Sequence, residues 1–235
     1  MDVIIERVRD ELLQKSDPRT KASGERFFKE DVTLYGLTMP AVERIAKTYY
    51  EDIRQRSKDD TFTLCEKLWR SGYLEEAMVA CNWAYARRKE YEPDDIKVFE
   101  RWVAEYVTNW ATCDTLCNHA VGDLLDMYPA LVDNLMRWAR SDNRWMRRAA
   151  AVSLIVPARQ GRFLDQVFAI ADILLRDADD LVQKGYGWML KAASQAHQSE
   201  VFDYVMRNKA AMPRTALRYA IEKMPPDLKA QAMAK

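Results

Sequence analysis

Glycine, proline and histidine are scarce in this chain. Its 235 residues include 7 Gly, 8 Pro and 2 His, whereas 49% are hydrophobic and 31% are charged. With so few helix breakers, and with abundant Ala, Leu, Arg, Glu, Lys and Met, the composition excludes disorder and favours helices. The alternation of apolar and polar residues that is typical of strands is also missing. The sequence therefore predicts an all-α protein.

An excess of one charge is absent as well. The 36 basic and 36 acidic residues cancel, which excludes a protein that coats polyanions by its bulk charge. Any nucleic-acid surface must therefore be local.

No stretch approaches the roughly 20 apolar residues that a membrane-spanning helix needs. Residues 1–6 lack the basic start and long apolar run of a signal peptide. We therefore expect a cytoplasmic protein with no membrane partner, and nothing in the sequence requires more than a monomer.

Cysteine is present but not in pairs of the Cys-x-x-Cys type. Cys65, Cys81, Cys113 and Cys117 fall within helical patterns, which predicts reduced, mostly buried thiols. Cys113 and Cys117 with His119 resemble half of a metal site, but a second ligand pair is lacking, so we expect no metal.

Helical periodicity covers nearly the whole chain and breaks at Ser, Asp, Gly and Pro clusters. Thr38 is a predicted N-cap, with Pro40 in the first turn that follows it. The predicted helices are 2–15, 19–30, 40–56, 61–70, 73–89, 94–107, 111–127, 129–140, 143–157, 162–176, 179–195, 199–208 and 214–223.

Similar capping clusters begin at Ser71, Ser141 and Asp177, offset by 70 and then 36 residues. These offsets fit two repeats and one repeat of about 35 residues, the size of HEAT-like helix pairs. The sequence contains no linker, so we expect one domain over residues 1–235. Its fold class is an all-α, right-handed α-α superhelix, a curved solenoid of HEAT-like two-helix repeats.

A six-residue phrase occurs twice, at 145–150 and at 188–193, 43 residues apart. Each copy places a Trp three residues before a cation, so both side chains share a helix face. A third element places Trp110 four residues before Asp114. These three elements together supply six side chains. We expect them at or near the start of the second helix of each helix pair, gathered on the concave face that solenoids use for binding. They are Trp110, Asp114, Trp145, Arg148, Trp188 and Lys191.

Two basic stretches, 137–148 and 207–223, point to phosphate as a partner. Ordinary solvated helix surfaces would explain the same charges. Likewise, an Asp at a helix start is by default an N-cap, and a Trp there is more often a packing wedge. We assign Trp69, Trp83, Trp102 and Trp138 to packing roles.

The order and spacing of these motifs resemble a known family. The segments are Trp110-x-x-x-Asp114, Ser141-Asp142-Asn143-x-Trp145-x-x-Arg148-Ala149-Ala150, Lys184-x-x-Gly187-Trp188-x-Leu190-Lys191 and Met212–Lys223. Together they resemble the HEAT-like-repeat DNA alkylation repair enzymes, which are alkylpurine DNA glycosylases of the AlkD kind.

This resemblance implies excision of positively charged N3- or N7-alkylated purines from double-stranded DNA, without a deep pocket for a flipped base. It makes Asp114 the carboxylate that stabilises the sugar cation, Trp110 and Trp188 the indoles on the deoxyribose, and Arg148 the phosphate clamp. No metal or organic cofactor is implied. Further nucleic-acid contacts are expected at Phe27, Arg144, Trp145, Arg147, Lys184, Lys191, Arg214 and Arg218.

Two positions depart from the family pattern. Phe27 stands where some members carry Tyr, and Val156 stands where some carry Lys. Two other functional classes fit the sequence: a non-catalytic helical-repeat protein that binds branched or damaged nucleic acid, and a protein-binding scaffold.

Overall fold

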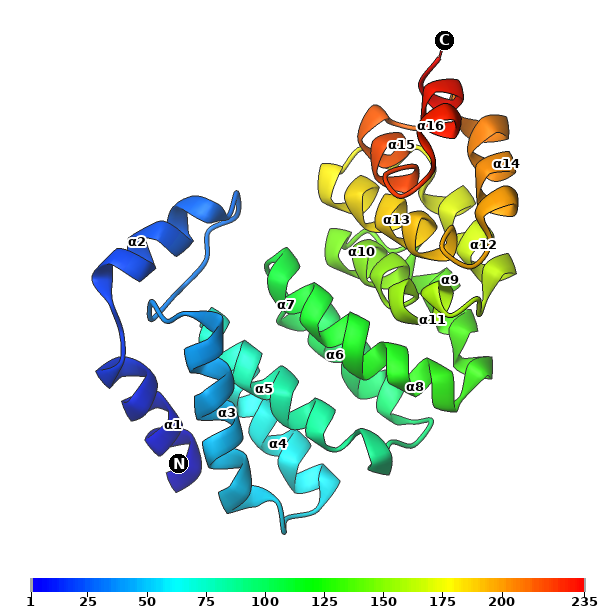
Figure 1. The fold of residues 1–235 in the computed structure, drawn as a ribbon. Helices are drawn as coiled ribbons and strands as arrows, with labels where there is room; N and C mark the ends of the chain where they lie inside the picture. Colours follow the sequence, from blue (N-terminus) through cyan, green and yellow to red (C-terminus); the bar gives the residue numbers. More distant parts are fainter. Residues whose placement is uncertain (1, 235) are drawn as a thin grey trace. The chain divides into compact units, whose positions relative to one another are not determined.

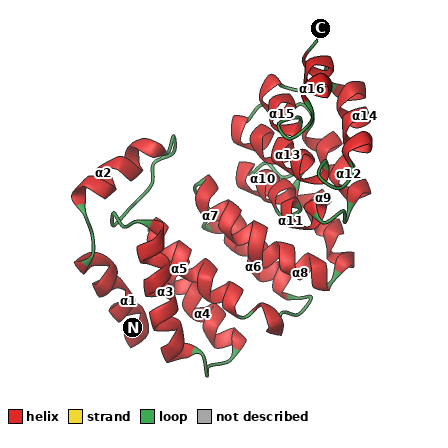
Figure 2. Ribbon diagram, viewed as in Figure 1, coloured by secondary structure: helices red, strands yellow, loops and turns green. Residues whose placement is uncertain are grey.

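A computed structural model describes residues 2–234, and most of these residues lie in helices (Figures 1 and 2). Within this range, one isolated parallel bridge between Thr33 and Tyr73 is the only extended pairing. The predicted all-α class is confirmed. The chain forms two compact units, Met1–Leu116 and Cys117–Lys235.

The first unit is arranged around α5, which packs against α3, α4 and α7. A helix that is buried on most of its faces needs mainly apolar residues, and α5 supplies them from Ala77 to Ala84, after the buried carboxylates of Glu75 and Glu76 in its first turn. The elements of this unit are α1 (Val3–Gln14), α2 (Pro18–Phe27), α3 (Met39–Ile53), α4 (Lys58–Trp69), α5 (Leu74–Ala86), the 3₁₀ turn η1 (Arg88–Glu90), α6 (Asp95–Glu105) and α7 (Trp110–Thr115).

The second unit is arranged around α13, which packs against α10, α11, α12, α14 and α15. Its elements are the π-helical η2 (Leu116–Val121), α8 (Gly122–Met127), the 3₁₀ turn η3 (Pro129–Val132), α9 (Asp133–Trp138), α10 (Arg144–Val152), α11 (Ile155–Arg159), α12 (Leu164–Leu174), α13 (Asp180–Ala193), α14 (Gln198–Asn208), α15 (Arg214–Ala220) and α16 (Pro226–Met233). Only the first residue of η2, Leu116, belongs to the first unit.

The predicted packing residues lie in the core. Trp83, Trp102 and Trp138 are fully buried, and Trp69 is nearly so. All four cysteines are buried too, as predicted.

The capping clusters mark helix starts as predicted. The Asn143 side chain accepts a hydrogen bond from the Trp145 amide at the start of α10, and Asp179 accepts from Leu181 and Val182 at the start of α13. Thr38 is the N-cap residue of α3, although its side chain makes no capping hydrogen bond.

Several predicted helices are wrong in extent. The helix expected over 143–157 breaks between α10 and α11, because Pro157 has no N–H and its ring would clash with the carbonyl four residues earlier, at Ser153. The helix expected over 111–127 contains the π-helical η2, which apolar periodicity does not distinguish from an α-turn. The second helix stops at Phe27 rather than residue 30, and α16 was not predicted.

The repeated six-residue phrase does not mark equivalent positions. Trp145 is the second residue of α10, whereas Trp188 and Lys191 lie in the later half of α13, which corrects their expected place near a helix start. The first residues of these helices, Arg144 and Asp180, are 36 residues apart, and the phrase recurs after 43. The difference of seven residues is about two helical turns, so the second copy keeps its helical face but lies two turns further along.

Candidate nucleic-acid interface

The first unit contributes a carboxylate next to an indole. Asn109 caps α7 by accepting a hydrogen bond from the Thr112 amide (3.0 Å), and Trp110 is the first residue of the helix. Asp114 follows one turn later, on the same face, and is only 8% exposed. A predicted N-cap role for Asp114 would not fit its place near the end of this short helix, because Asn109 holds that role.

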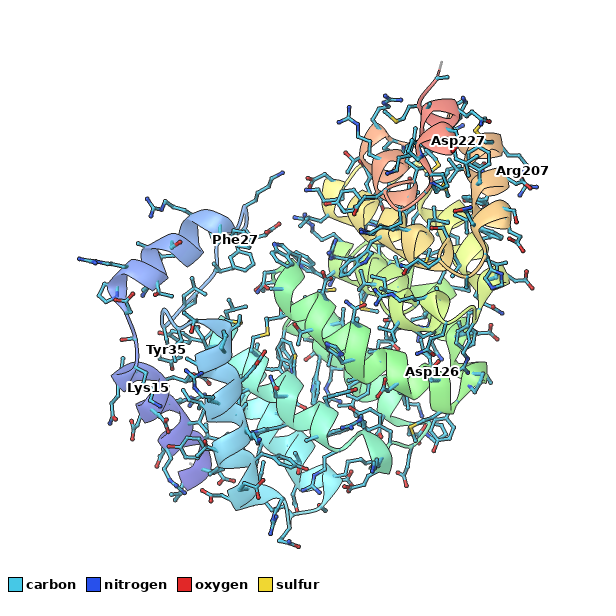
Figure 3. The ribbon with its side chains drawn as sticks, in the orientation of Figure 1. Lys15, Phe27, Tyr35, Asp126, Arg207 and Asp227 are labelled. Carbon is cyan, nitrogen blue, oxygen red and sulfur yellow. The ribbon has the colours of Figure 1, made fainter. Side chains whose placement is uncertain are left out.

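Three aromatic rings meet at this site. The Trp110 ring lies 5.8 Å from the ring of Phe27 and 5.5 Å from that of Phe28, and the two Phe rings are 5.5 Å apart in an edge-to-face arrangement. These are ordinary distances for attractive aromatic pairs. Phe27 remains 68% exposed at the end of α2 (Figure 3), so its ring presents a large apolar surface to the solvent.

The second unit holds Arg148 in a slot between α10 and α13. Its guanidinium donates a hydrogen bond to the Leu181 carbonyl, and only 5% of the residue is exposed. Gly185 of α13 lies beside this side chain, and a Cβ there would be in ordinary contact with the Arg148 Cγ at 3.5 Å. The slot therefore fixes the direction of a guanidinium that would otherwise be mobile.

Two other arginines of α10 form ion pairs with the loop before α13. Arg144 lies 2.8 Å from Asp179 and over the ring of Trp145, and Arg147 lies 2.6 Å from Asp177. Arg147 also donates to the carbonyls of residues 141 and 142. These guanidiniums thus join one helix pair to the next. Trp145 itself is 8% exposed.

Lys191 lies in a small cage of side chains. Its ammonium is 5.9 Å from the Trp188 ring, 5.5 Å from the Tyr219 ring and 2.9 Å from a carboxylate oxygen of Glu222. One turn of α13 and the end of α15 therefore place a cation between two aromatic faces. Lys184, on the same helix, pairs with Asp180 at 3.0 Å.

Arg214 and Arg218 lie one turn apart on α15, and both are exposed. Within residues 2–234, neither forms an ion pair with an acidic side chain. They are the predicted nucleic-acid contacts whose charge is least compensated by the protein.

The predicted site residues thus fall into two groups. Phe27, Trp110 and Asp114 belong to the first unit, where the two rings and the carboxylate lie together. The second unit holds Arg148 and Trp188, and the basic and aromatic candidates Arg144, Trp145, Arg147, Lys184, Lys191, Arg214 and Arg218.

Sequence reasoning missed three partners of these residues. Phe28 completes the ring cluster, and Tyr219 and Glu222 complete the cage around Lys191. Phe28 could have been found from its neighbour, because it directly follows the expected contact Phe27 in the sequence. The pairing of Lys191 with Glu222 depends on how α13 meets α15 and leaves no local signal.

Among the described residues, no group of three or more His, Cys, Asp and Glu side chains could hold a metal ion. None of the helices in the same range combines the length and apolar character needed to cross a bilayer.

Comparisons with known proteins agree on one family. A family model described as "DNA alkylation repair enzyme" matches residues 8–224. A solved structure of a predicted DNA alkylation repair enzyme from Enterococcus faecalis superposes with a TM-score of 0.81 over 90% of this chain and 97% of that chain, at 16% sequence identity. At this identity the likeness shows a shared fold. None of the curated proteins matches the chain.

Proposed function

Because this chain belongs to the DNA alkylation repair enzyme family, we propose that it is a monofunctional DNA glycosylase within that repair role. Its substrates are N3- and N7-alkylated purines that carry a positive charge in double-stranded DNA. The observation that carries the proposal is the buried Asp114 carboxylate, placed one helical turn from Trp110 and its ring cluster.

The proposed reaction requires the protein to stabilise only the sugar cation. Alkylation at N3 or N7 gives the purine a positive charge, so the glycosidic C–N bond can break with its electron pair moving to the base, which leaves neutral. The deoxyribose is left as an oxocarbenium-like cation. A fixed carboxylate such as Asp114 stabilises this cation in the transition state more than in the ground state. Water then adds to the sugar carbon and releases a proton.

The other residues act by holding the DNA. Trp110, with Phe27 and Phe28 beside it, offers aromatic faces and edges to the lesion's deoxyribose. In the second unit, Trp188 offers a further indole, and Arg148, directed by the Leu181 carbonyl, binds a backbone phosphate. The proposed reaction uses no metal or organic cofactor and needs only a monomer.

The deciding experiment measures release of 7-methylguanine and 3-methyladenine from methylated duplex DNA. We expect release by the wild-type chain and its loss in Asp114→Asn, which keeps the size of the side chain and removes its charge. DNA binding should change little, because Asp114 is not a phosphate contact. Asp95→Asn is the matched control, since Asp95 is a comparably buried carboxylate of the same unit (6% exposed).

Equal release by wild type and Asp114→Asn would show that the carboxylate has no catalytic role. A wild-type chain that binds duplex DNA but releases no base would favour the non-catalytic nucleic-acid-binding class. Phe27, which lacks the hydroxyl of the Tyr found in some relatives, is the residue that most favours this second class.

A further inference from the structure

Helix α2 lies outside the core of its unit. None of its residues is buried, yet its last residue, Phe27, and the following Phe28 make two sides of the ring cluster on Trp110. Core packing therefore does not fix this helix, and something else must hold its end against α7.

The connector that follows α2, residues 28–38, is anchored to α5 in several places, and one buried carboxylate accepts three of its backbone hydrogen bonds. Glu75, in the first turn of α5, accepts hydrogen bonds from the backbone amides of Tyr35 (3.0 Å), Gly36 (2.8 Å) and Leu37 (3.1 Å). Only 1% of Glu75 is exposed. Three hydrogen bonds from one loop to a buried, charged acceptor are far stronger than a surface contact.

The same segment holds α2 in turn. The Asp17 amide, at the N-cap of α2, donates to the Gly36 carbonyl (3.1 Å), and Gly36 has a φ of +102°. A Cβ at Gly36 would lie 2.6 Å from the Asp17 carbonyl oxygen. Further along α2, Gly24 fits against the buried Leu34, whose Cδ1 would lie 2.6 Å from a Cβ at that position.

These contacts form a continuous path. Glu75 holds residues 35–37, and Gly36 in turn holds Asp17 at the N-terminal end of α2. Leu34 packs against Gly24 further along the helix, which carries Phe27 and Phe28 to Trp110. The path closes because α5, which carries Glu75, packs directly against α7, which carries Trp110. Figure 3 labels Phe27 at the end of α2 and Tyr35 on the segment that Glu75 holds.

From this path we infer that Glu75 is a positioning residue that fixes the ring cluster beside Asp114. The inference rests on the proposed glycosylase function, in which that cluster faces the lesion's sugar. Glu75 contacts neither the DNA nor the reacting atoms. It acts through the connector, residues 28–38, and through α2.

The test compares Glu75→Gln and Glu75→Ala with the wild type. Gln keeps one acceptor oxygen and loses the other, and Ala removes both, so the losses should be graded. We expect the single-turnover excision rate to fall about tenfold in Glu75→Gln and further in Glu75→Ala, since small misplacements of positioning groups have effects of this order. The DNA concentration that gives half-saturation should change less than about twofold, because the phosphate contacts remain.

A double-mutant cycle separates positioning from general damage. In a Phe27→Ala, Phe28→Ala background the rings are gone, so Glu75→Gln should lower the rate by less than about twofold. An undiminished tenfold loss in that background would overturn the inference. Asp95→Asn is the control. It removes a buried carboxylate that accepts a hydrogen bond from Lys58, at a position far from residues 28–38 in the sequence. This variant should be less stable but should not show the graded loss of excision rate.

Hydrogen exchange tests the path without any activity. Glu75→Gln should speed exchange of the amides of residues 35–37 and of the last turn of α2, and Asp95→Asn should not. Unchanged exchange in α2 would overturn the inference even if the wild type excises bases. Faster exchange in a chain that releases no base would support the path while the glycosylase proposal fails.

Discussion

Two glycines of α13, two positions apart, have opposite surroundings. A Cβ at Gly187 would lie 2.7 Å from the Tyr219 Cβ and 2.8 Å from the Ala216 carbonyl oxygen, so α15 approaches the α13 backbone closely there. A Cβ at Gly185 would make ordinary contacts, with the Arg148 Cγ at 3.5 Å the nearest atom. Packing therefore requires glycine at position 187 but not at position 185.

Replacing each glycine with alanine should therefore change stability in opposite directions. Gly187→Ala should lower the free energy of unfolding by roughly 1–3 kcal/mol, because a backbone carbonyl cannot move aside. Gly185→Ala should raise it by about 0.5–1 kcal/mol through better helix propensity. Urea denaturation of both variants measures the difference, and a loss of similar size in both would contradict the packing argument.

At the scale of elements, Glu66 joins α4 to α6. Its carboxylate accepts hydrogen bonds from Arg70, the C-cap residue of α4 (2.7 Å), from Arg101 on α6 (2.5 Å) and from the Tyr106 hydroxyl (3.2 Å). Burial alone would raise the pKa of this carboxyl, but the Arg101, Arg70 and Tyr106 contacts outweigh it and hold the pKa below the ordinary value of 4.5. The folded state therefore favours the charged form.

This lowered pKa predicts a pH-dependent contribution to stability. An acid with a lowered folded pKa stabilises the protein above its unfolded pKa and loses that contribution as the pH falls through the folded value. At pH 7 the free energy of unfolding of the wild type should exceed that of Glu66→Gln by about 1 kcal/mol, a modest value because the arginine partners are exposed. This difference in stability should shrink below pH 4.5. Denaturation from pH 3 to 7 measures it, with Glu51→Gln in an exposed pair as a near-neutral control. A gap that does not vary with pH would refute the assignment.

Elements could be predicted where local chemistry decides them. Asn143 and Asp179 mark helix starts because a side-chain acceptor caps the amides next to it, whatever lies around the helix. The π-helical η2 could not be predicted, because side-chain patterns do not encode its backbone pairing. The hydrogen bonds of Glu75 to residues 35–37 could not be predicted either, because they join positions distant in the chain. In the candidate site, Trp110 and Asp114 could be placed on one face from their spacing, whereas the approach of Phe28 to Trp110 depends on where α2 ends.

For the whole molecule, the zero net charge limits how DNA can be held. Arg144, Arg147, Lys184 and Lys191 form ion pairs with acidic side chains of the chain itself. Arg214 and Arg218 have no such partner within residues 2–234. Among the exposed predicted contacts, Arg214 and Arg218 should therefore contribute most to the electrostatic part of DNA binding.

Salt titrations of duplex binding test the assignment of Arg214 and Arg218 as phosphate contacts. Arg214→Gln should reduce the slope of log K against log salt by about 0.9, the value for one lost phosphate contact, and Arg218→Gln should do the same. Arg147→Gln should leave the slope unchanged and lower stability instead, because its guanidinium holds Asp177 and two backbone carbonyls. A reduced slope in Arg147→Gln alone would reverse these assignments.

The burial of all four cysteines has a practical consequence for labelling. None of the thiols is exposed, and burial raises the pKa of Cys65 far above that of a reactive thiol. A maleimide dye should therefore react with a single cysteine introduced at an exposed position, such as Ser23 on α2, and leave the native thiols unmodified. The natural sequence already serves as the cysteine-silent background that fluorescence studies usually have to engineer.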